Sequence, residues 1–135
     1  MSATPSRRIA TVALLVADYD VAIAWYRDCL RLDLLEDVDL GGGKHWVVMG
    51  TPEGGAHVLL AKADGPSQQA RIGDQTGGRV FLFLETDDFD RDHAAMLAKG
   101  VVFLEEPRRE PYGTVAVFED LHGNRWDLIQ PRRDG

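Results

Sequence analysis

Short apolar runs and one segment of helical spacing alternate along the first half of the chain. Ala22, Tyr26 and Leu30 recur every four residues, which is the spacing of a buried helical stripe. Asp18 or Asp20 is suited to cap the start of that helix. Gly-rich turns separate the later apolar runs. The pattern predicts a strand over about residues 8–16, a helix over about 19–30, and strands near 34–38, 45–50 and 56–61.

The second half of the chain repeats this order of elements. The tripeptide DFD (88–90) answers DYD (18–20) 70 residues later, and GNRWDLI (123–129) answers GAHVLLA (55–61) at an offset of 68. Repetition of elements together with residues indicates a duplicated supersecondary unit. We therefore expect an α+β chain built as a tandem βαβββ repeat. Its second copy has a strand over 79–86, a helix over 88–99, and strands over 101–106, 113–120 and 125–130.

The chain is expected to form one domain of two modules, spanning residues 1–135. Module one covers about 8–62, module two covers about 79–131, and a polar segment at 63–78, rich in Gly, Gln and Ser, joins them. A linker of this length without strong structural signals is either a mobile connector or a lid over a ligand.

Composition narrows the possible partners. The formal charge of −7 argues against nucleic acid or an anionic membrane as the main partner. The single cysteine, Cys29, excludes an internal disulfide. The basic start and short apolar run at 6–18 resemble a targeting signal. However, this run has its counterpart at 79–86 in the second repeat, so we expect a mature strand in a cytoplasmic protein.

Three segments carry a resemblance to a known family. They are TVALLVADYDVAIAWY (11–26), TDDFDRDHAAMLAKGV (86–101) and EEPRREPYGTVAVFEDLHGNRWDLIQP (105–131). In this order they resemble the vicinal oxygen chelate superfamily, also called the glyoxalase / bleomycin resistance / dioxygenase superfamily. The resemblance implies two βαβββ modules whose mixed sheets curl around a cleft. It also implies a homodimer, with the cleft closed either within one chain or across the dimer.

The resemblance further assigns the positions of a metal site. In metal-using members, the first and last strands of each module supply four ligands, usually His or Glu. The matching positions here are Thr11, Leu59, Phe81 and Asp127. Two of these are hydrocarbon and Thr is a weak donor, whereas a catalytic metal needs about three N, O or S ligands. We therefore predict that the usual metal site is absent.

Strand alternation places other candidates beside these positions. His57 shares a face with Leu59, and it is either a rim histidine, a substitute ligand or a general base. Arg125 shares a face with Asp127, so Asp127 either pairs with Arg125 or contacts a ligand. Trp46 and Tyr112 are aromatic groups that could line the cleft.

Three functions are compatible with these residues. The first is binding of a small organic molecule in a cleft between the modules without a metal, and it requires the fewest assumptions. The second is a metal-dependent lyase or dioxygenase that holds Zn, Ni, Mn or Fe with a displaced set including His57 and Asp127. The third is a metal-free enzyme with His57 or Asp127 as the base. One fold hosts all of these activities.

Overall fold

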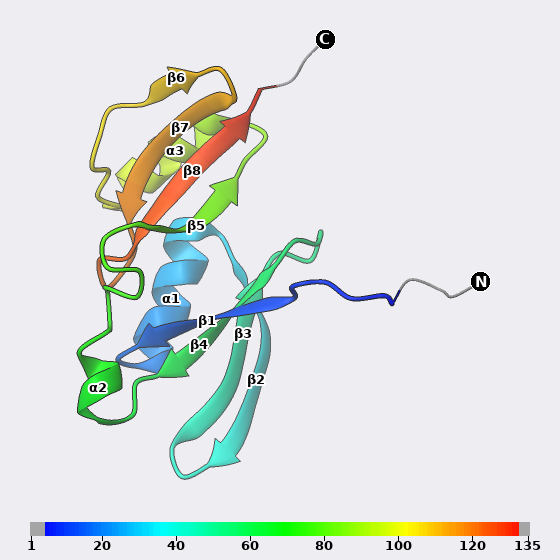
Figure 1. Cartoon of the computed structure of the whole chain (residues 1–135), viewed down its shortest axis with the longest axis vertical. Helices are drawn as coiled ribbons and strands as arrows, with labels where there is room; N and C mark the ends of the chain where they lie inside the picture. Colours follow the sequence, from blue (N-terminus) through cyan, green and yellow to red (C-terminus); the bar gives the residue numbers. More distant parts are fainter. Residues whose placement is uncertain (1–4, 133–135) are drawn as a thin grey trace.

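Two four-stranded mixed sheets, each accompanied by one long helix, make up the computed structural model, which describes residues 5–132 (Figure 1). In each sheet the first and last strands of a module pair in parallel, and the other pairings are antiparallel. The first sheet has the order β1 (Thr11–Val16), β4 (His57–Lys62), β3 (Lys44–Gly50), β2 (Asp33–Gly41). The second has the order β5 (Val80–Glu85), β8 (Arg125–Pro131), β7 (Gly113–Glu119), β6 (Arg108–Glu110). The predicted α+β fold of two βαβββ modules is confirmed.

Each of the two long helices starts after a capping aspartate, and for the first it is Asp18, one of the two predicted caps. Helix α1 (Tyr19–Leu30) is capped by Asp18, whose carboxylate accepts a hydrogen bond from the Val21 amide at 2.9 Å. Helix α3 (Phe89–Ala98) is capped in the same way by Asp88. Both caps satisfy an amide that the first turn leaves without an intrahelical partner.

The strand predicted over residues 101–106 is wrong, because this segment makes a single bridge, between Phe103 and Phe118, and β6 lies further on at Arg108–Glu110. Two backbone hydrogen bonds still tie the segment to β7. At the next position the Glu105 carboxylate, rather than a backbone carbonyl, accepts the Val117 amide at 3.0 Å. Pro107 then contributes no amide donor. The ladder is therefore interrupted between 104 and 108.

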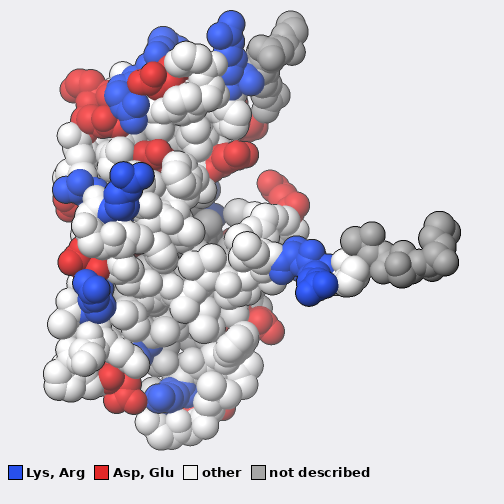
Figure 2. Space-filling view, viewed as in Figure 1, with Lys and Arg blue, Asp and Glu red and all other residues white. Residues whose placement is uncertain are grey.

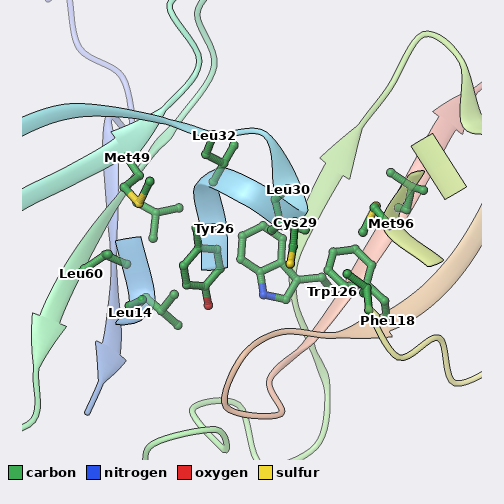
Figure 3. Close-up of a cluster of buried hydrophobic side chains, with 14 of the residues drawn as sticks. Leu14, Tyr26, Cys29, Leu30, Leu32, Met49, Leu60, Met96, Phe118 and Trp126 are labelled. Carbon is green, nitrogen blue, oxygen red and sulfur yellow. The ribbon is translucent and has the colours of Figure 1, made fainter. Parts of the chain in front are cut away.

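One hydrophobic core serves both modules. Tyr26 of α1 and Trp126 of β8 lie at its centre, with ring centroids 6.0 Å apart, and side chains from the two sheets flank them (Figure 3). The Tyr26 hydroxyl donates a hydrogen bond to Asp120, which follows β7, at 2.7 Å. Because the helix side of each sheet is used for this shared core, the opposite faces of both sheets remain uncovered. In Figure 1 these faces lie in front of the helices.

The segment joining the modules contains the short helix α2 (Gly65–Gln69) and is attached to the first module by Gln75. The Gln75 side chain accepts a hydrogen bond from the Leu15 amide and donates one to the Ala13 carbonyl, so it occupies the free edge of β1. Within residues 5–132 no helix is long and apolar enough to cross a membrane.

Candidate functional site

The uncovered face of the first sheet brings together four of the predicted site residues. Thr11 and His57 are register partners across β1 and β4, and Leu59 is the next residue of β4 on that face. Leu59 pairs in turn with Val48 of β3, two residues from Trp46. Thr11, Trp46, His57 and Leu59 therefore share one surface.

That surface is mostly uncharged. Trp46 is 42% exposed, and its register partner Val38 is 51% exposed. The Trp46 indole nitrogen donates a hydrogen bond to Glu36 at 3.1 Å, which fixes the ring on the face. Figure 2 shows that the centre of the lower half of the molecule, over this sheet, has few charged side chains.

His57 is positioned by packing rather than by a polar partner. A Cβ atom on Gly50 would lie 2.7 Å from the His57 ring, so the absence of a side chain at Gly50 lets the ring lie against the backbone. Within residues 5–132 the imidazole takes part in none of the hydrogen bonds or ion pairs of the structure. A general base is normally oriented by a second group, and His57 lacks one here.

The uncovered face of the second sheet carries Asp127. Its side chain is 9% exposed, and Val117 and Phe83 are its register partners on β7 and β5. Burial raises the pKa of this carboxyl above its ordinary value. The possible pairing with Arg125 does not form, because Arg125 donates to the Gly78 carbonyl at 3.2 Å instead. Among the residues that the structure describes, Asp127 Oδ1 has no hydrogen-bond partner.

Phe81 does not lie beside Asp127 in the sheet. The pairing of β5 with β8 shifts between Val80 and Leu82, and Phe81 packs against the core. Phe83 is instead the residue opposite Asp127, and it is 62% exposed. A one-residue irregularity of this kind changes which side chains face outward, and neither residue types nor spacing identified it.

A polar group that sequence reasoning did not select lies on the same face. Arg108 of β6 donates to Glu105 at 2.9 Å and to Glu110 at 2.8 Å. Tyr112, 54% exposed, lies beside Arg108 in the turn before β7. These charges were not identifiable from the sequence because the interrupted segment before β6 was predicted to be a strand.

The positions that the family uses for metal do not fit a metal ion in this chain. Thr11 and Leu59 lie on one sheet, and Phe81 and Asp127 belong to the other. Only Asp127 offers a strong oxygen donor. In the part of the chain that the structure describes, no group of three His, Cys, Asp or Glu side chains is arranged to hold a metal ion.

A separate groove of about 800 Å³ lies between the end of α1, the end of β5 and α3. None of the predicted site residues lines it. Arg91, on its wall, is paired with Asp87 and Asp92. Burial raises the pKa of the Cys29 thiol, also on this wall, which keeps it in its unreactive form. We therefore place the candidate site on the sheet faces.

Comparisons with known proteins agree with this geometry. A protein of Shewanella frigidimarina without an assigned function is 52% identical over 124 residues, covering 90% of this chain and 92% of that protein. The crystal structure of TnmS3, an antibiotic binding protein from Streptomyces sp. CB03234, has a TM-score of 0.79 at 26% identity, covering 96% of this chain and 100% of TnmS3. The structure of UcmS2 has the same TM-score at 25% identity, covering 93% and 98%. The sequence model of the Glyoxalase/Bleomycin resistance protein/Dioxygenase superfamily matches residues 8–128. The chain belongs to this superfamily.

Proposed function

We propose that this protein binds a small organic molecule on the uncovered sheet faces, without a metal ion. The observation that carries the proposal is the exposed apolar surface on the two faces, formed by Trp46 and Val38 on the first sheet and by Phe83 on the second. Exposed apolar groups that cluster on one face of a soluble domain mark binding surfaces. The similarity to TnmS3, which binds an antibiotic, supports the same class of function here.

We also propose that two copies of the chain form a homodimer in which these faces come together around the bound molecule. In the single chain the two faces belong to separate sheets joined through the core around Tyr26 and Trp126 (Figure 3). Exposed Phe83 on the second sheet and Leu40, 61% exposed at the end of β2, would otherwise remain in water. Covering them with a second copy removes that unfavourable hydration.

NMR titration with a planar apolar probe tests the binding proposal. We expect 1-naphthalenemethanol to shift the indole N–H signal of Trp46 in a saturable way, because that ring is 42% exposed while Trp126 is 3% exposed. The Trp126 signal should move little and serves as the internal control, and a Trp46→Phe variant assigns the responding signal.

Three outcomes would contradict the proposal. Absence of any saturable shift with naphthalene and acridine derivatives would show that this surface does not bind such molecules. Recovery of a chemically altered probe by mass spectrometry would replace binding by catalysis. Stoichiometric Zn, Ni, Mn or Fe that is lost in Asp127→Ala would restore the metal-dependent alternative.

A further inference from the structure

Asp127 is an unsatisfied carboxylate in a buried position. In the described part of the chain, its Oδ1 is the one buried side-chain nitrogen or oxygen atom that has no hydrogen-bond partner. The side chain is 91% buried and is flanked in the sheet by Val117 and Phe83. Folding removes water from such an oxygen without replacing it, and native proteins satisfy nearly all of these groups. A ligand that supplies the missing donor would explain why the residue is tolerated.

The polar neighbours of Asp127 are already engaged with one another. Both oxygens of Glu105 accept hydrogen bonds, from Arg108 Nε and from the Val117 amide. The Arg108 guanidinium forms its ion pairs with Glu105 and Glu110 and forms none with Asp127. The cation that could have neutralised Asp127 is therefore held by two other carboxylates.

The charge of this face favours a cation. Three carboxylates, those of Asp127, Glu105 and Glu110, surround the single guanidinium of Arg108. At the other end of the face, Glu119 and Arg125 are register partners and contribute opposite charges. The summed charge of these side chains is negative, so the face attracts cationic groups and repels anionic ones.

We infer, building on the proposed function, that the molecule bound on this face carries a protonated amine that donates a hydrogen bond to Asp127 Oδ1, with its apolar part against Phe83. An ammonium group supplies both the donor that Asp127 lacks and the positive charge that the three carboxylates favour. The ionised carboxylate would accept a hydrogen bond from either an alcohol or an ammonium, and the ammonium adds Coulomb attraction to it. An alcohol supplies only the donor, and a carboxylate supplies neither the donor nor the charge.

Three probes of matched shape test this inference. We would measure by calorimetry the dissociation constants of 1-naphthylmethylamine, 1-naphthalenemethanol and 1-naphthoate at pH 7. We expect the amine to bind about tenfold more tightly than the alcohol, and the carboxylate to bind most weakly. This order is measured on the unaltered protein, so it does not depend on the folding of any variant.

Two variants assign the preference to Asp127. Asp127→Asn keeps the size of the side chain and removes its charge, and it should reduce the affinity for the amine to that for the alcohol. Asp74→Asn removes the same charge from the exposed linker, where Asp74 faces Arg71, and should leave the order unchanged. A thermal melt of each variant establishes that it is folded.

The outcomes separate this inference from the proposed function. If the three probes bind equally, or if Asp127→Asn keeps the preference for the amine, the inference is overturned while small-molecule binding stands. If no probe binds and the Trp46 signal does not move, both are overturned. A preference for the amine that disappears in Asp127→Asn alone supports the inference.

Discussion

Replacing Tyr26 by phenylalanine should weaken the connection between the two modules. The Tyr26 side chain is 1% exposed, and its hydroxyl lies 2.7 Å from Asp120 Oδ2. Asp120 is itself 6% exposed and accepts five hydrogen bonds in all, the others coming from Trp126, Asn124 and the His122 amide. The substitution deletes one of these five donors and adds no atoms.

The expected loss follows from the charge of the acceptor. A hydrogen bond to a charged group contributes about 1.5–3 kcal/mol, against roughly 1 kcal/mol between neutral groups. We therefore expect Tyr26→Phe to lower the free energy of unfolding by about 2 kcal/mol, which is roughly 6–10 °C in the melting temperature for a domain of this size. The four remaining donors keep Asp120 satisfied, so the variant should still fold.

Urea denaturation followed by circular dichroism measures this loss, and Tyr19→Phe is its control. Tyr19 lies on the same helix, but its hydroxyl forms its hydrogen bonds with the uncharged backbone of His45, at 3.2 and 3.4 Å. We expect a loss below about 1 kcal/mol there. Equal losses in the two variants, or a loss below about 0.5 kcal/mol in Tyr26→Phe, would refute the role assigned to the Asp120 contact.

Two further predictions concern the uncovered faces. Asp127→Asn should raise the free energy of unfolding at pH 7 by about 1 kcal/mol. Burial and Glu105 raise the pKa of Asp127 against the opposing effect of Arg108. The wild-type protein therefore loses stability as the pH rises through that raised pKa. The advantage of the variant should disappear below pH 3.8, the ordinary pKa of an aspartate. Melts from pH 3.5 to 7 measure this, and a variant less stable than the wild type at pH 7 would contradict it. Light scattering should give a mass twice that of one chain; Phe83→Lys should reduce it, and Leu97→Lys on α3, a side chain 49% exposed, should not.

Much of the fold could be predicted because its signals are local. The bounds of α1 follow from the spacing of Ala22, Tyr26 and Leu30 and from the cap at Asp18, and the structure has a helix over Tyr19–Leu30. The strands of the first module follow from apolar runs between turns in the same way. The segment 101–106 failed because its pairing with β7 depends on the Glu105 side chain, which takes the Val117 amide. An apolar run of strand length does not indicate whether a side chain or a backbone carbonyl will accept a neighbouring amide.

The contact between the modules was not predictable for a related reason. Tyr26 was expected to belong to the buried stripe of its helix, and it does. Its partner Asp120 lies 94 residues away in the other module. The spacing within one helix indicates which side is buried, but it carries no information about which distant carboxylate meets the hydroxyl.

The state of Asp127 shows where strand alternation stops being informative. Alternation predicts that Asp127 and Arg125 share a face, and from that alone a salt bridge between them is a reasonable expectation. The outcome depends instead on partners outside β8: Arg125 donates to the Gly78 carbonyl, and Arg108 is held by Glu105 and Glu110. Both guanidinium groups near Asp127 are therefore engaged elsewhere. Among the described residues its Oδ1 therefore stays buried without a donor, and this arrangement, rather than the residue type, is the reason why we propose Asp127 as the group that recognises an amine.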